Sequence, residues 1–223
     1  DLQRIHLEIS QYEFKWLGIS VFSFEQKEDA LKLGEEYDNV LFGGSGVDIN
    51  WPRRNFIVGE GEYTVLEFLK GNLDYPGING KSPKQIKSIE ELPPPDYSDV
   101  VHKHKYSSAI ISGSRGCVRN CTFCDVASIW PMYRWKTGKQ IADDMHIVAE
   151  QTGLKSIGFS DSLVNGSMKH FRDMCSELAK RKKKIQWGGQ FIVRGAKTFS
   201  NKDFDNLANS GCDHLTMGLE SGS

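Results

Sequence analysis

Residues 114–124 read Ser-Arg-Gly-Cys-Val-Arg-Asn-Cys-Thr-Phe-Cys, so three cysteines, Cys117, Cys121 and Cys124, fall within eight residues. The apolar residues 109–111 ahead of this run predict a strand that leads into it. Cubane iron–sulfur clusters normally take four thiolates, and sulfur-based zinc sites close with four protein ligands. Three thiols on one short loop therefore predict a cluster that keeps one coordination position open for another ligand.

The chain has five cysteines, and the two outside this run stand alone. Cys175 belongs to an amphipathic helix pattern, and Cys212 precedes an apolar strand pattern. Both positions suit small core residues better than metal ligands. An odd number of unevenly clustered cysteines argues against a secreted disulfide framework, so we expect a reducing compartment and a cytoplasmic protein.

The charge balance gives no sign of a nucleic-acid or membrane partner. The chain has 28 basic and 29 acidic residues, for a net charge of −1. No segment approaches the roughly 20 apolar residues of a membrane span, and a signal-peptide pattern is absent from the start. Because the sequence begins at Asp1 in mid-pattern and ends just after a predicted strand, we expect it to be a piece of a longer protein.

The residues Leu-Pro-Pro-Pro-Asp-Tyr at 92–97 form a stiff segment that predicts a division into two domains. We expect a first domain over 1–92, a proline-rich linker over 93–105 and a second domain over 106–223. Strands and helices alternate in the first domain, which implies a parallel sheet with crossover helices. Its predicted elements are strands at 16–24, 40–42 and 56–58, and helices at 27–37 and around 65–69.

The same alternation resumes after the prolines, so the fold class is α/β throughout. The predicted strands are 108–112, 155–160, 185–190 and 214–219, and the predicted helices are 139–151, 167–182 and 201–209. Four such strands make about half of a closed barrel. In sheets of this kind ligands bind beyond the carboxyl ends of the strands, which is where the cysteine loop falls.

The cysteine run, including the aromatic Phe123 before its last cysteine, resembles the signature of the radical S-adenosylmethionine enzymes. The resemblance covers nearly everything from Tyr106 onward and implies a partial radical SAM barrel, truncated after its fourth strand. It implies that the three thiolates bind three irons of a [4Fe-4S] cluster and that S-adenosylmethionine chelates the fourth. This division of ligands is chemically reasonable, because soft thiolates favour iron–sulfur clusters and the harder nitrogen and oxygen donors of S-adenosylmethionine take the one exposed iron.

Further S-adenosylmethionine contacts follow from the same resemblance. Asp161 ends the second barrel strand, where the family holds the methionine amino group, although an N-cap or turn role is an alternative. Arg194 could pair with the carboxylate of S-adenosylmethionine, or it could be an exposed loop arginine. The segment 218–223 resembles the part of the fourth strand that reaches the ribose hydroxyls, with Glu220 as their acceptor and Ser221 beside it.

The first domain resembles the last part of the cobalamin-binding, Rossmann-like domain that precedes the barrel in a large subgroup of this family. The matching stretches are 17–22, 43–44 and 59–67. The resemblance implies that Ser20, Gly43 and Gly44 lie along the nucleotide tail of cobalamin, because glycine lets the backbone approach a bulky ligand. A tight turn is the alternative for the glycines. The Asp-x-His-x-x-Gly motif that supplies a cobalt ligand in many such domains is absent from this sequence.

Two hypotheses about function follow. The first is a radical enzyme that cleaves S-adenosylmethionine reductively to a 5′-deoxyadenosyl radical, for which cobalamin-dependent methyl transfer or cyclisation is open. It would need a small-molecule substrate and an electron donor such as flavodoxin or ferredoxin. The second is a non-catalytic zinc module in which the three cysteines and one histidine hold the metal.

Overall fold

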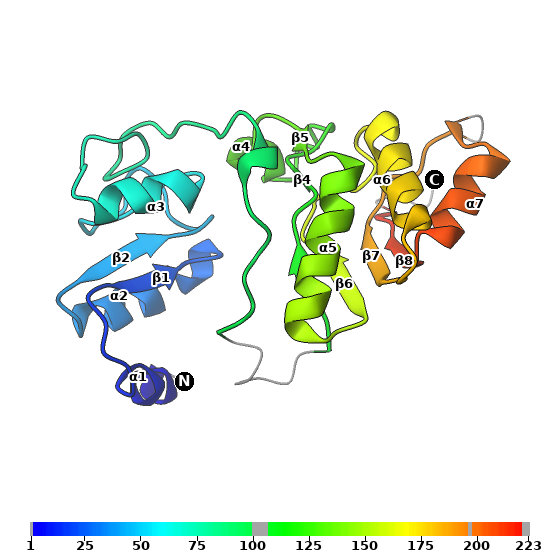
Figure 1. Cartoon of the computed structure of the whole chain (residues 1–223). Coiled ribbons are helices and arrows are strands. Elements are labelled where there is room, and N and C mark those ends of the chain that lie inside the picture. The colour runs from blue at the N-terminus through cyan, green and yellow to red at the C-terminus, as the bar shows by residue number, and fades with distance from the viewer. Residues whose placement is uncertain (1, 100–106, 196–197, 220–223) are drawn as a thin grey trace. The chain divides into compact units, whose positions relative to one another are not determined.

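The computed structural model describes residues 2–99, 107–195 and 198–219 (Figure 1). The chain divides into two compact units, Asp1–Ile86 and Lys87–Ser223. Both units combine helices with parallel strands, so the predicted α/β class is confirmed. The domain limits at 92 and 106 stay predictions.

The first unit is built on two parallel strands with the register Leu17 to Val40 through Ser20 to Gly43. The predicted strand at 56–58 is reduced to isolated bridges, which join Phe42 to Phe56 and Ile57 to Ile78. An N-terminal helix, for which we had no expectation, precedes the first strand. The elements are α1 (Leu2–Ile9), β1 (Leu17–Ser20), η1 (Phe24–Gln26), α2 (Lys27–Glu35), β2 (Val40–Gly43) and α3 (Gly61–Leu69).

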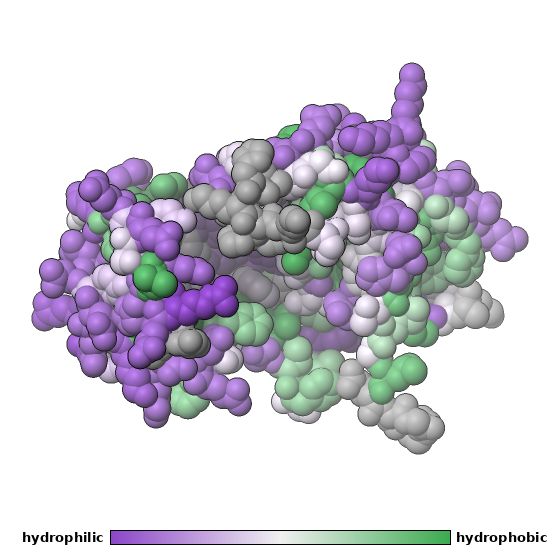
Figure 2. Space-filling model, turned by 90° about the horizontal axis from the view of Figure 1, so that it is seen from below, coloured by the Kyte–Doolittle hydropathy of each residue, from purple (hydrophilic) through white to green (hydrophobic). Residues whose placement is uncertain are grey.

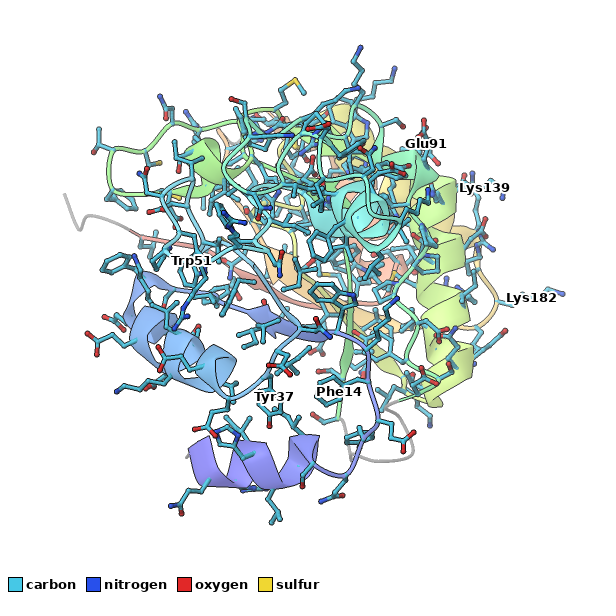
Figure 3. The ribbon with its side chains drawn as sticks, turned by 90° about the vertical axis from the view of Figure 1, so that its left-hand side faces the viewer. Phe14, Tyr37, Trp51, Glu91, Lys139 and Lys182 are labelled. Carbon is cyan, nitrogen blue, oxygen red and sulfur yellow. The ribbon has the colours of Figure 1, made fainter. Side chains whose placement is uncertain are left out.

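Aromatic contacts attach α1 to the rest of the first unit. The ring of His6 stacks on Tyr37 with centroids 5.8 Å apart, and His6 Nδ1 lies 3.1 Å from the Tyr37 hydroxyl. Phe14, in the connection to β1, packs against the same ring at 5.9 Å, and Figure 3 shows Phe14 and Tyr37 over α1. The helix is therefore held by side-chain contacts and adds no strand to the sheet.

The second unit contains a four-stranded parallel sheet in the order β3-β6-β7-β8. A short antiparallel pair, β4 with β5, lies outside this sheet and was not expected. The elements are η2 (Ile89–Glu91), β3 (Ala109–Ile111), β4 (Ser114–Arg115), α4 (Val126–Ile129), β5 (Arg134–Trp135), α5 (Gly138–Thr152), β6 (Ser156–Phe159), α6 (Met168–Lys180), β7 (Gln186–Gln190), α7 (Asn201–Asn209) and β8 (Cys212–Thr216).

Capping residues set the ends of the helices in this unit. Thr137 caps α5 by accepting a hydrogen bond from Gln140 N, and Gly153 ends the helix in the left-handed conformation. Ser200 caps α7 and forms a capping box with Asp203. The predicted helix bounds at 139–151 and 201–209 agree with these ends within two residues.

The core of the second unit lies between the sheet and the helices α5, α6 and α7, and α5 and α6 lie in front of the strands in Figure 1. Trp187 and Phe171 are its largest buried side chains. Ile110 points the other way and is 50% exposed, because alternate residues of a strand face opposite sides. One face of the sheet is thus packed, and the other carries exposed side chains, as in half of a barrel.

The described part of the proline-rich segment is tied to the second unit. The Tyr97 hydroxyl donates to Ile110 O and accepts from Ile110 N, both at 2.9 Å, at the edge of the sheet. Lys136 Nζ donates to Leu92 O at 2.9 Å and to Asp144 Oδ2 at 2.7 Å, with both charged groups buried. The segment is thus anchored by polar contacts, of which the one from Lys136 is buried, as well as stiffened by its prolines.

Figure 2 shows one face of the molecule coloured by hydropathy. Seen from below in Figure 2, hydrophilic residues cover most of the coloured surface, with smaller hydrophobic patches between them. Among residues 2–99, 107–195 and 198–219, no helix has both the length and the apolar character that crossing a membrane requires.

Candidate functional site

The three cysteines lie on a loop whose base is the β4–β5 pair. Ser114 is opposite Trp135 and Arg115 is opposite Arg134, so residues 116–133 form one excursion that starts just after β3. Gly116 has a φ of 82°, and a side chain there would meet Met132 O at 2.6 Å. The loop therefore begins at the carboxyl end of a parallel strand, where the sequence predicts it.

The thiols on this loop are free and accessible. Cys117 is half-buried, Cys121 and Cys124 are exposed, and none of them forms a disulfide. A turn joins the last two, with Cys124 N donating to Cys121 O at 3.1 Å, and Arg119 N lies 3.4 Å from Cys117 Sγ. Phe123, between the last two cysteines, is 73% exposed.

The donor set suits an iron–sulfur cluster, although the structure does not gather the sulfurs. Within the part of the chain that the structure describes, no three His, Cys, Asp or Glu side chains lie together as a metal site. Thiol donors select soft metals and iron–sulfur clusters. Three free thiols on one loop can therefore serve as cluster ligands.

The other two cysteines are placed as core residues. Cys175 on α6 is 2% exposed, and burial raises the pKa of its thiol to about 12. Cys212, at the start of β8, is half-buried, and burial raises its pKa to about 11. Neither belongs to the loop, so the expectation that they are packing residues is confirmed.

Asp161 follows β6 and is buried beneath the cysteine loop, with 4% of its surface exposed. Its carboxylate accepts hydrogen bonds from Gly113 N at 2.8 Å and from Ser114 Oγ at 2.5 Å. Burial raises the pKa of Asp161 to about 6, against the opposing effect of these hydrogen bonds and of the Lys136 charge. The side chain thus contacts the base of the loop, and a contact with S-adenosylmethionine stays a prediction.

Arg194, beyond β7, contacts the loop that leads into α6. Its guanidinium donates to Asn165 O at 2.9 Å and to Gly166 O at 2.7 Å. The Asn165 side chain is fully buried and exchanges two 2.9 Å hydrogen bonds with the backbone of Ile192. Arg194 therefore holds two neighbouring loops together, and its predicted role toward a ligand carboxylate stays a prediction. Glu220 and Ser221 lie outside the described residues.

Sequence reasoning missed two residues at the base of the loop, Ser114 and Tyr133. Ser114 is 2% exposed, and Tyr133 OH donates to Leu163 O at 3.4 Å. Burial raises the pKa of Tyr133. One signal for Tyr133 is present in the sequence at Gly166. The Tyr133 ring lies so close to this glycine that a side chain at position 166 would overlap it.

A hollow in the first unit lies at the carboxyl ends of β1 and β2. It has a volume of about 440 Å³ and is lined by the three residues predicted to contact cobalamin, Ser20, Gly43 and Gly44. Its remaining lining is glycine and apolar side chains, namely Gly18, Ile19, Leu41, Phe42, Ile57, Gly59, Gly61 and Val65.

The glycines of the hollow differ in the space around them. A side chain at Gly18 or Gly43 would meet nothing within 4 Å. At Gly44, where φ is 103°, it would meet Val21 O at 2.4 Å. Gly44 therefore serves the backbone turn, which was the alternative considered for it, while Gly43 keeps the hollow open.

Comparison with known proteins finds relatives of this chain. In sequence, the chain is 27% identical over 187 residues to "Uncharacterized methyltransferase PH0819" of Pyrococcus horikoshii, covering 74% of this chain and 40% of that protein. It is 30% identical over 112 residues to the anaerobic magnesium-protoporphyrin IX monomethyl ester cyclase of Rubrivivax gelatinosus, covering 50% and 20%. The chain thus spans less than half the length of these relatives.

Solved structures share the fold. The cobalamin-dependent S-adenosylmethionine radical enzyme OxsB matches with a TM-score of 0.70 and 20% identity, over 100% of this chain and 38% of that one. The radical S-adenosylmethionine methyltransferase TsrM from Kitasatospora setae matches with a TM-score of 0.70 and 16% identity, over 98% and 51%. The family model of the Radical SAM superfamily matches residues 111–223, just over half of the sequence. The chain therefore belongs to the Radical SAM superfamily.

Proposed function

We propose that the chain holds a [4Fe-4S] cluster on Cys117, Cys121 and Cys124 and cleaves S-adenosylmethionine reductively. When bound, the cluster would supply the electron that breaks the sulfonium bond and yields a 5′-deoxyadenosyl radical able to abstract hydrogen from a substrate. One observation carries the proposal. Three free thiols share a loop directly after the first strand of a parallel sheet, within the segment that matches the family.

The residues of this chain would bind and orient the reactants. The three thiols would hold three irons and leave the fourth to the amino and carboxylate groups of S-adenosylmethionine. Asp161, Arg194, Glu220 and Ser221 remain the candidates for contacts with S-adenosylmethionine or for supporting the loops around it. Phe123 is exposed on the same loop and is a further candidate for contact with S-adenosylmethionine.

We propose further that the hollow of the first unit takes part of a cobalamin molecule. Ser20, Gly43 and Gly44 line it, the apolar remainder suits a flat aromatic base, and the absent side chain at Gly43 leaves room for one. A hollow of about 440 Å³ fits the nucleotide tail rather than the whole cofactor. Bound cobalamin would supply methyl-transfer or cyclisation chemistry, in line with the printed names of the relatives and structural neighbours.

We also propose a class of substrate, a reductant and a compartment. The substrate would be a small molecule, the reductant a protein such as flavodoxin or ferredoxin, and the compartment the reducing cytoplasm that a low-potential cluster and free thiols require. The competing zinc module would need a fourth ligand, such as a histidine, beside the three thiols.

Anaerobic reconstitution tests the cluster. Protein supplied with iron and sulfide should turn brown, bind about four irons per chain, and release 5′-deoxyadenosine when given S-adenosylmethionine and dithionite. Cys121→Ala should abolish the release, and the matched control Cys212→Ala, which changes a cysteine outside the loop, should retain it. Colourless protein with one tightly bound zinc, or undiminished release from Cys121→Ala, would overturn the assignment.

A binding titration tests the hollow. Aqua-cobalamin should bind the wild-type chain with a visible spectral change. Gly43→Val, which places a side chain in the open space of the hollow, should weaken binding by about tenfold or more, equivalent to about 1.4 kcal/mol. Gly195→Val is the matched control, because that glycine also faces open space but lies in the second unit. Equal affinities in all three proteins would rule out the hollow as the site.

A further inference from the structure

The base of the cysteine loop rests on a buried polar contact with the segment after β6. Asp161 Oδ1 accepts from Gly113 N at 2.8 Å, and Asp161 Oδ2 accepts from Ser114 Oγ at 2.5 Å. Both side chains are almost fully buried, with 4% of Asp161 and 2% of Ser114 exposed. A buried carboxylate is costly unless it is hydrogen-bonded, and here each oxygen has a donor from the base of the loop.

The second strand of the base is attached to the same segment. Tyr133, just before β5, donates its hydroxyl hydrogen to Leu163 O at 3.4 Å, and Ser114 Oγ lies 3.3 Å from the same carbonyl. Lys136, just after β5, donates its backbone N–H to Gly113 O at 2.9 Å. Both ends of the excursion that carries the cysteines are thus held to residues 161–163.

The upper part of the loop is different in character. Residues 118–125 are exposed, and the hydrogen bond from Cys124 N to Cys121 O is local. The exposed part has few buried contacts of its own, so the contacts that attach the loop to the rest of the unit lie mainly at its base.

We propose that Asp161 is a positioning residue that holds the base of the cysteine loop, so that the three thiols are presented to one cluster, and that it does not itself contact S-adenosylmethionine. This role rests on the proposed function, in which the loop holds an iron–sulfur cluster. Burial of the carboxylate agrees with it, since a group contacting a bound ligand from this position would need an open face, and Asp161 has almost none.

Hydrogen–deuterium exchange on the cluster-free full chain tests the anchor without relying on activity. Asp161→Ala should speed exchange of the hydrogen-bonded amides at the base of the loop, Gly113 N and Lys136 N, by about tenfold or more, which corresponds to about 1.4 kcal/mol of lost local protection. Asp161→Asn keeps an acceptor for Gly113 N and should restore rates to within about threefold of the wild type. Ser114→Ala, the milder change, should give an intermediate rise.

Two controls separate local loosening from general loss of stability. Met174→Ala weakens the core of the second unit and should speed exchange of its sheet and helices together. Asp143→Asn changes a carboxylate on α5 that pairs with Lys139 and with Arg181 at the end of α6, away from the loop, and should leave the loop unchanged. Wild-type loop rates in Asp161→Ala, or a rise that only follows the pattern of Met174→Ala, would overturn the anchor.

Binding of S-adenosylmethionine to reconstituted protein separates anchoring from direct contact. If Asp161 positions the loop, Asp161→Asn should keep the wild-type iron content and bind S-adenosylmethionine within about twofold. A tenfold weaker affinity in Asp161→Asn, with unchanged loop exchange, would mean that its charge contacts the ligand and would overturn the inference. If the wild-type chain takes up no cluster, the proposed function fails, while the exchange experiment still decides whether Asp161 anchors the loop.

Discussion

The hollow of the first unit and the cysteine loop of the second are built in opposite ways. The hollow is shaped by backbone and by missing side chains, with Gly43 leaving space and Gly44 making the turn. The loop depends on three reactive side chains, and only its base is held by buried contacts. The first site is thus formed before any ligand arrives, whereas the thiols of the second are exposed and not gathered. Changes at the two sites should therefore have different signatures.

The largest difference should appear in thiol reactivity. Burial raises the pKa of Cys175 to about 12, which makes its thiolate about a thousandfold scarcer than that of an ordinary cysteine. In cluster-free protein, iodoacetamide should therefore label the exposed Cys121 and Cys124 about a thousandfold faster than Cys175, as followed by peptide mass spectrometry. Cys212, half-buried with a pKa raised to about 11, should be intermediate. Similar rates at Cys175 and Cys121 would show that the loop is not the reactive region.

The next largest effect should come from Gly44→Ala. The φ of 103° and the contact of the new side chain with Val21 O cannot both be relieved without moving β1 or the turn. We expect a loss of about 3 kcal/mol in the stability of the first unit. Hydrogen exchange of the β1 and β2 amides should accelerate, while β6 and β7 in the second unit remain at wild-type rates. Unchanged exchange in β1 would show that the turn tolerates a side chain.

The pH dependence of stability should change through the base of the loop and not through the hollow, whose lining has no titratable side chain. Burial raises the pKa of Asp161 to about 6, so its contribution to stability falls as the pH rises from about 4 to 6. Burial lowers the pKa of His170 to about 4, so its contribution falls as the pH drops from about 6.5 to 4. The two slopes oppose each other in the wild type.

Asp161→Asn removes one of these slopes. The unfolding free energy of the second unit should then rise with pH more steeply than in the wild type, by up to about 1.4 kcal/mol per pH unit between about pH 4 and 6. Urea unfolding at several pH values in that window measures it, with Asp143→Asn as the control. Parallel profiles for Asp161→Asn and the wild type would show that the carboxyl does not titrate there.

The smallest effect should come from Gly43→Ala. Its methyl group would enter open space, so the first unit should be unchanged or up to about 1 kcal/mol more stable, because alanine restricts the unfolded chain. The hydrogen-exchange rates of the β2 amides should be compared between Gly43→Ala and Gly44→Ala, which change neighbouring glycines. A loss of stability in Gly43→Ala comparable with that in Gly44→Ala would mean that the hollow does not have the open space described above.

Periodicity predicted the regular elements better than the irregular ones. The pattern of Phe171, Met174, Cys175 and Leu178 identified α6, and all four side chains are buried. The strand predicted at 56–58 forms only isolated bridges, and the β4–β5 pair was not expected, because such short pairings depend on what lies opposite them. The last strand begins at Cys212 instead of His214, within the usual uncertainty of element ends.

The sequence by itself determined the spacing of the three cysteines and the α/β class. Both follow from local information, since ligand spacing and the alternation of strands and helices are properties of short segments. Only the tertiary structure decided what Asp161 and Arg194 contact and which glycine leaves the hollow open. The partners of Asp161 lie 47 and 48 residues away along the chain, and pairings over such a distance depend on how the strands come together.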